Sequence, residues 1–118
     1  MPKPRVRVRS YNVRFGDCIL VSLSSGDGEK HILFDFGNAP SSVKARGGVN
    51  DVFEPVAKDI CKVTSGTLDL LVMTHEHLDH MEGFLDQKKI FDKMNVRDVW
   101  MSVMSAPDYY KRFRHCKP

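Results

Sequence analysis

Residues 68–80 read LDLLVMTHEHLDH, an apolar run that passes directly into a cluster of histidines and acidic residues. The run from Leu68 to Met73 is short and nearly continuous, which is typical of a strand buried on both faces of a sheet. In open α/β sheets, ligand sites gather beyond the carboxyl ends of such strands. We therefore expect a functional site in the polar cluster that follows Met73.

The imidazoles of His75, His77 and His80 and the carboxylate of Asp79 lie within six positions. In extended backbone His75 and His77 share a face and can direct their rings at one ion, so the spacing predicts a loop at the strand end. Asp79 and His80 are adjacent in the sequence, so their side chains are expected to diverge. This arrangement suits two metal ions side by side better than a single closed site. Such ligands suit zinc, iron or manganese, and the lack of nearby thiolates argues for an open, catalytic site.

The alternative explanation is that these are surface histidines of a polar loop, or core histidines with backbone partners. The chain contains only five histidines, and three of them fall in this stretch. Chance clustering is therefore the weaker explanation.

Three upstream segments have the pattern of strands. Residues 5–9 alternate arginine with valine, which predicts an edge strand with Val6 and Val8 pointing inward and the arginines outward. Residues 18–23 and 31–36 predict two more strands, and the turn residues Gly26-Asp27-Gly28 separate them. The chain is therefore expected to open with antiparallel strands.

Helices are predicted between and after the strands. Apolar residues recur at three- and four-residue intervals over residues 49–63, with Pro55 in the first turn and residues 64–66 as the end. A second helix is predicted from residues 84–94, a strand from 99–101 and a helical turn at 107–108. Residues 38–49 predict a loop, in which Lys44 and Arg46 could contact an anionic substrate. Helices packed against a sheet predict one α/β layered domain over residues 1–118.

The motif His75-x-His77-x-Asp79-His80 resembles the His-x-His-x-Asp-His signature of the metallo-β-lactamase superfamily. Residues 34–37, FDFG, resemble the family's earlier Asp-x-Gly element. Residues 16–18, GDC, resemble the Gly-Asp turn of members related to DNA-uptake competence proteins, although Asp17 alone is best explained as a residue that stabilises a bend.

This resemblance implies an αββα sandwich and a metal site built on the motif. His75 and His77 would ligate one zinc ion, Asp79 and His80 a second, and Asp35 would hold a ligating imidazole through that ring's other nitrogen. The implied reaction is hydrolysis by a metal-bound hydroxide, with Asp79 as the catalytic residue that holds both water and metal. Substrates in the superfamily include phosphodiesters, β-lactams, thioesters and lactones, and the sequence does not choose among these small molecules and phosphodiesters.

The family completes its site with a further histidine, a bridging aspartate and a last histidine, all well downstream of the motif. In this chain only His115 lies beyond His80, within a basic terminal segment. We therefore expect an N-terminal fragment that contains one half of the sandwich and is inactive by itself. Such a fragment would expose the apolar face meant for the missing half and would self-associate through it.

Composition sets the remaining expectations. The chain is 42% hydrophobic and 28% charged, and no run approaches the roughly 18 apolar residues of a membrane-spanning helix, so a globular protein with no membrane partner is predicted. Its three cysteines have no paired spacing, which favours a reducing compartment, the cytoplasm. Two other functions stay open: a nucleic-acid-binding or processing module, suggested by the basic chain ends and Gly16-Asp17, and a non-catalytic relic.

Overall fold

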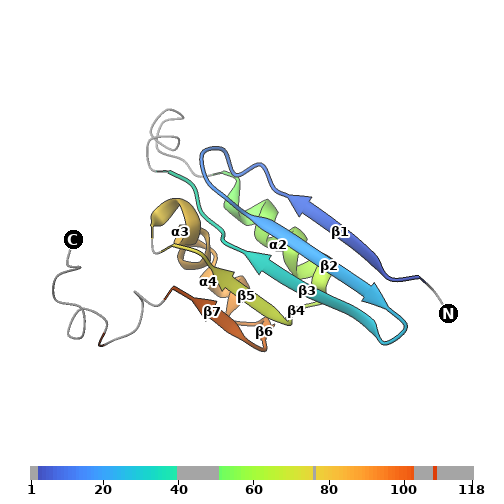
Figure 1. Cartoon of the computed structure of the whole chain (residues 1–118). Helices are drawn as coiled ribbons and strands as arrows, with labels where there is room; N and C mark the ends of the chain where they lie inside the picture. Colours follow the sequence, from blue (N-terminus) through green and yellow to red (C-terminus); the bar gives the residue numbers. More distant parts are fainter. Residues whose placement is uncertain (1–2, 40–50, 76, 103–107, 109–118) are drawn as a thin grey trace.

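The computed structural model describes residues 3–39, 51–75, 77–102 and 108. Within these residues the chain is mixed α/β, with a five-stranded sheet and three helices (Figure 1). The predicted α/β class is confirmed. The predictions that involve Lys44, Arg46 and His115 lie outside the described residues.

The first three strands form an antiparallel unit, as predicted. They are β1 (Arg5–Ser10), β2 (Ile19–Ser25) and β3 (Gly28–Phe34), and β2 pairs with both of its neighbours. Gly28 closes the β2–β3 turn with a φ of 106°, a backbone conformation that residues with a Cβ rarely adopt.

Two parallel strands extend this unit into a sheet of order β1-β2-β3-β5-β7. They are β5 (Leu70–Met73) beside β3, and β7 (Val99–Met101) beside β5. The single strand predicted from Leu68 is divided at Asp69, because the short strand β4 (Thr67–Leu68) leaves the main sheet to pair with β6 (Asn95–Val96).

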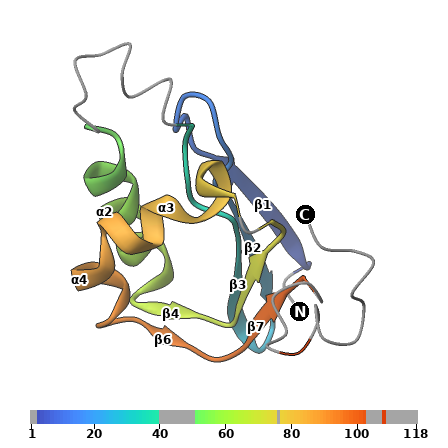
Figure 2. The same ribbon diagram turned by 90° about the vertical axis from the view of Figure 1, so that its left-hand side faces the viewer.

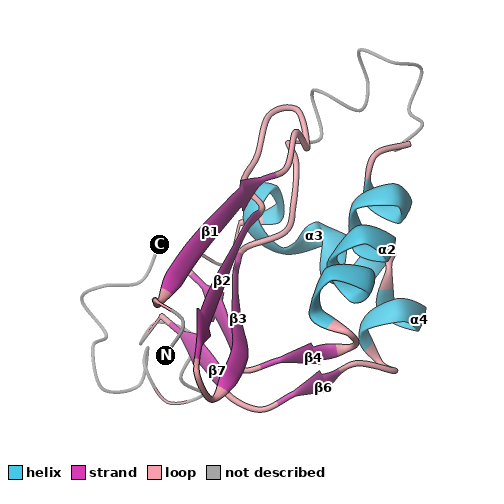
Figure 3. Cartoon of the chain, turned by 90° about the vertical axis from the view of Figure 1, so that its right-hand side faces the viewer, coloured by secondary structure: helices cyan, strands magenta, loops and turns pink. Residues whose placement is uncertain are grey.

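All three helices lie on one side of the five-stranded sheet (Figures 2 and 3). They are α2 (Phe53–Thr64), α3 (Leu78–Asp86) and α4 (Lys88–Phe91). The predicted first helix is confirmed, with Pro55 in its first turn and a left-handed Ser65 at its end. The second helix was predicted to begin near Phe84, but α3 begins six residues earlier, within the histidine cluster.

The core lies between the helices and the sheet. Its centre is Phe36, a fully buried side chain just beyond β3. The Phe36 ring contacts the rings of Phe53, Phe84 and Phe91 at centroid distances of 5.0–5.7 Å, and these three come from α2, α3 and α4. One aromatic side chain therefore joins every helix to the sheet.

No described segment covers the opposite side of the sheet, which we call the open face (Figure 3). Strand alternation and pairing register place ten apolar side chains there: Val6, Val8, Ile19, Val21, Leu23, Ile32, Phe34, Leu70, Val72 and Trp100. Two predictions are therefore wrong. The valines of β1 are not inward but 65% and 63% exposed, and β5 is buried on its helix side alone, through Leu71.

Among the described residues, none of the helices is long and apolar enough to span a bilayer.

Candidate metal centre

The predicted site residues meet where β3 and β5 end. Asp35 follows β3 directly, and Thr74 and His75 follow β5. These two strands are parallel and adjacent, so their carboxyl ends lie at the same edge of the sheet. The topology thus brings Asp35 to the histidine motif although about 40 residues separate them in the chain.

Asp35 is a buried carboxylate, only 3% exposed, whose two oxygens are both engaged. Oδ1 accepts the backbone N–H of Thr74 at 2.7 Å, and Oδ2 accepts the Thr74 hydroxyl and lies 3.0 Å from His80 Nδ1. The backbone of Asp35 is left-handed, with a φ of 58°, so the strand ends before this residue. The predicted strand of residues 31–36 therefore extended two residues too far.

His80 is oriented by this carboxylate. An Nδ1–H that donates to Asp35 leaves the other ring nitrogen, Nε2, with its lone pair available, which is the tautomer that a metal-ligating imidazole needs. Nε2 lies 3.5 Å from Asp79 Oδ2. Two ligand atoms bound tetrahedrally about 2.0–2.1 Å from a zinc ion would lie about 3.4 Å apart, so this spacing suits one shared ion.

The side chains of Asp79 and His80 therefore approach each other, and the prediction that they diverge is wrong. The reason is that both residues lie in the first turn of α3 rather than in a loop. His77, in extended backbone, is the last residue before the helix, so the predicted loop holds for His75 and His77 alone.

The rings of His75 and His77 lie beside this pair. His75 stacks on His80 at a centroid distance of 4.6 Å and on His77 at 5.8 Å. All four predicted ligands are thus neighbours, but within the described residues no three His, Cys, Asp or Glu side chains converge as a ready metal-binding group. The donor set fits a metal ion in its chemistry, and the Asp79–His80 pair fits one in its spacing as well.

A third segment, Gly16-Asp17, packs against the motif from the β1–β2 connection. The Asp17 N–H donates to the carbonyl of Asp79 at 3.2 Å, and a Cβ on Gly16 would lie 2.0 Å from the carbonyl oxygen of Gly37. Only glycine fits this approach. The Asp17 carboxylate is 3.5 Å from His80 Nδ1, so this residue borders the site and does more than stabilise a bend.

Two neighbouring residues change what sequence reasoning alone would conclude. Thr74, to which we assigned no role, holds Asp35 with both its N–H and its hydroxyl; its position directly before the motif is the signal that could have identified it. Cys18 is 1% exposed, and burial, with a smaller contribution from the charge of Asp35, raises the pKa of its thiol. Cys18 therefore belongs to the hydrophobic core.

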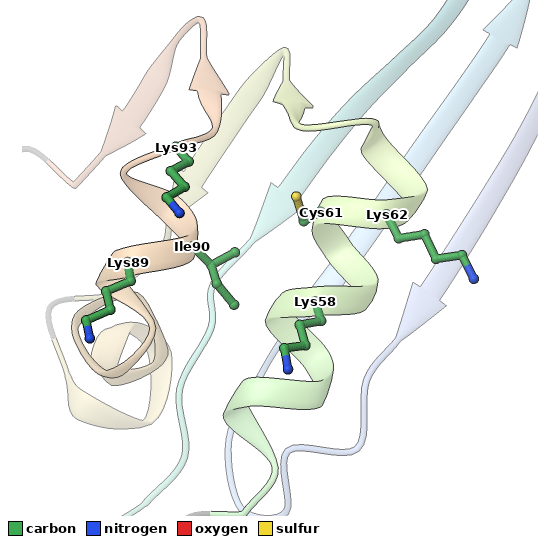
Figure 4. Close-up of a pocket in the computed structure, with 6 residues that line it drawn as sticks. All are labelled: Lys58, Cys61, Lys62, Lys89, Ile90 and Lys93. Carbon is green, nitrogen blue, oxygen red and sulfur yellow. The ribbon is translucent and has the colours of Figure 1, made fainter.

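A second feature, absent from the sequence predictions, is a groove between α2 and α4, on the outer side of the helix layer (Figure 4). Its apolar floor contains Cys61 and Ile90, and its volume is about 420 Å³. Four lysines line it: Lys58, Lys62, Lys89 and Lys93. Their i, i+4 spacing in two segments is the signal that the sequence offers for this groove.

Lys58 is paired with Glu54 at 2.7 Å. For the other three groove lysines no ion pair within 4 Å is found among the described residues.

No family model matches the chain, and searches of curated proteins and of solved structures gave no significant match.

Proposed function

We propose that the chain binds a divalent metal ion through Asp79 and His80, with His75 and His77 as further ligands, in a hydrolase site of the metallo-β-lactamase type. The observation that carries this proposal is the orientation of His80, whose Nδ1 faces Asp35 and whose Nε2 lies 3.5 Å from Asp79 Oδ2. A bound zinc, iron or manganese ion would supply an activated water near neutral pH and polarise the bond under attack.

The chain's own residues would prepare this chemistry in three ways. Asp35, itself fixed by Thr74, keeps the His80 ring in one orientation and one tautomer. Asp79, whose carboxylate is about one-third exposed at the start of α3, would hold the ion together with His80 and could accept a proton at this carboxylate. Asp17, at the rim, adds negative charge that favours a cation.

The same proposal extends to the fold: the sheet with helices on one side corresponds to one half of an αββα sandwich. Two features support it, the apolar open face and the placement of the motif at the carboxyl ends of β3 and β5. The expected substrate is a small molecule or a phosphodiester.

Metal content, measured by elemental analysis after dialysis against zinc, iron or manganese, tests the proposal. We expect near-stoichiometric metal in the purified chain and a loss of most of it in a His75→Ala, His77→Ala variant and in Asp79→Asn. Asp86→Asn is the matched control, because its carboxylate is exposed at the far end of α3. Equal metal content in all four proteins, or none in any, would reject the metal centre and leave a non-catalytic relic.

A second candidate function, the binding of nucleic acid or another polyanion, is favoured by the lysine groove. A volume of about 420 Å³ is within the range of ligand pockets, and the apolar floor suits a base or another flat ring. The surrounding ammonium groups suit phosphates. This activity would be independent of the metal centre, which lies at the edge of the sheet.

Fluorescence titration of a labelled single-stranded oligonucleotide, in buffer with EDTA, tests this second function. We expect a Lys89→Ala, Lys93→Ala variant to bind more weakly and to reduce the slope of log K against log salt by roughly 0.7 per lost phosphate contact. Lys3→Ala, Arg5→Ala removes the same charge from the basic N-terminal end and is the comparison that separates the groove from the chain end. Equal losses in both variants would mean that net charge, not the groove, determines binding.

A further inference from the structure

The open face of the sheet is apolar from one edge to the other. Val6 and Val8 on β1 are 65% and 63% exposed, and Trp100 on β7, at the opposite edge, is 65% exposed. The strands between them continue the apolar surface, and the register places one charged side chain on it, that of Lys30 beside Leu23, whose ammonium lies 3.6 Å from Asp69. This surface therefore spans all five strands.

The strand directions argue that this surface is covered in the working protein. β3, β5 and β7 are parallel to one another, and strands in parallel arrangement are usually covered on both faces, unlike antiparallel strands such as β1 and β2. Here the helices cover one face, and Leu71 on that side of β5 is buried. Its neighbours Leu70 and Val72 point to the other side, where no described element lies over the sheet (Figure 3).

The size of the open face suits a specific interface. Five strands about 4.8 Å apart, the longer ones about 20 Å in length, give a projected area of roughly 400–500 Å². Two such faces in contact would bury roughly 1,000 Å² in total, which is the level that separates specific interfaces from incidental contacts. Two apolar sheets pack directly, about 10 Å apart, with their strands turned by roughly 30°.

We propose that two copies of this chain associate open face to open face about a two-fold axis. Apart from Lys30, the strands place no charged side chain on this face that would select a different partner, and a largely apolar, extended sheet is complementary to itself. Trp100, the only tryptophan of the chain, would pass from solvent into the interface. The association does not depend on metal binding, since the metal centre uses the strand ends and α3.

Sedimentation velocity and tryptophan emission over a range of concentrations test this dimer. We expect a species of twice the 13.5 kDa chain mass, with emission that shifts to shorter wavelength as the concentration rises. Val8→Lys should weaken the dimer by roughly a hundredfold or more, because an unpaired ammonium would be buried at the interface. Leu85→Lys is the control, since Leu85 is equally exposed, at 64%, but lies on α3.

Circular dichroism establishes that each variant is folded, and Val6→Thr, which keeps the β-branched shape, serves if Val8→Lys fails to fold. A monomer with solvent-exposed tryptophan at all concentrations would overturn the proposal. So would a monomer with buried tryptophan, because the chain would then cover the face itself. Equal weakening by Val8→Lys and Leu85→Lys, or open-ended aggregation, would overturn it as well.

Discussion

Asp35 shows how much one buried carboxylate can organise. Its two oxygens contact three polar groups of two residues, Thr74 and His80. In Asp35→Asn one acceptor oxygen becomes an amide that donates, so the contact with either Thr74 or His80 is lost. We expect the free energy of unfolding to fall by about 1–3 kcal/mol and metal affinity to fall about 10–100-fold.

Chemical denaturation and zinc titration measure these two effects. Asp17→Asn is the matched control, because Asp17 is 56% exposed and only 3.5 Å from the same His80 nitrogen. Its effect on unfolding should stay within about 0.5 kcal/mol. Similar losses in both variants would show that charge near His80, and not the buried contacts of Asp35, is what matters.

Asp69 makes a second residue-scale prediction, about pH. Burial acts to raise the pKa of its carboxyl, but the backbone N–H of His31 at 2.8 Å and the charges of Lys30 and Arg97 outweigh burial and lower the pKa. The stability that Asp69 contributes is therefore present above the unfolded pKa of about 3.9 and is lost as the pH falls through the lower folded value.

An Asp69→Asn variant should consequently be less stable than the wild type at neutral pH and should lose less stability on acidification below about pH 4. Denaturation midpoints measured across this range give the comparison. Parallel pH profiles for the two proteins would contradict the prediction.

At the scale of elements, α3 is held against the sheet through Gly83. A Cβ at this position would lie 2.6–2.7 Å from three atoms of the Phe36 ring, which Phe53, Phe84 and Phe91 enclose. Alanine at an exposed helix position would stabilise by up to about 1 kcal/mol relative to glycine. Here the steric clash should dominate, so we expect Gly83→Ala to destabilise the fold by about 1–3 kcal/mol.

Thermal and chemical unfolding of Gly83→Ala beside Leu85→Ala test this expectation, since Leu85 lies in the same helix and is exposed. The Leu85 variant should be close to the wild type. An increase in the unfolding free energy of Gly83→Ala would mean that α3 can move away from Phe36 at little cost.

The elements that local pattern predicts well are those with a clear period and a clear end. The β1–β3 unit and α2 were predicted because alternation, turn glycines and the 3.6-residue repeat are local signals. The start of α3 was not, because His77 makes no side-chain capping bond and the histidine cluster has no apolar periodicity. The two-residue strands β4 and β6 are too short to leave any pattern.

At the scale of the whole molecule, the sequence predicted that the histidine motif would follow a strand, but it did not predict how the motif and the distant segments meet. The approach of Gly16 to Gly37, and the hydrogen bond from Phe36 N–H to the His80 carbonyl at 2.7 Å, depend on tertiary packing between distant segments. The alternation in β1 correctly predicted a strand. It could not predict that the valines would be exposed, because alternation marks two faces without saying which one is covered.

Salt should affect the two proposed interactions of the molecule differently, because polyanion binding depends on charge and the dimer depends on apolar burial. Binding of a polyanion at the lysine groove should weaken steeply as sodium chloride rises, since phosphate contacts release counterions. The open-face dimer buries apolar side chains, so sodium sulfate should strengthen it and cooling should weaken it.

Sedimentation velocity at two temperatures and two sulfate concentrations, beside oligonucleotide titrations over sodium chloride, measures both responses on one protein. A dimer that dissociates in salt would mean that charged groups, such as the arginines of β1, hold the copies together instead of the sheet. The open face would then remain accessible in the dimer, and Trp100 would keep the emission of an exposed indole.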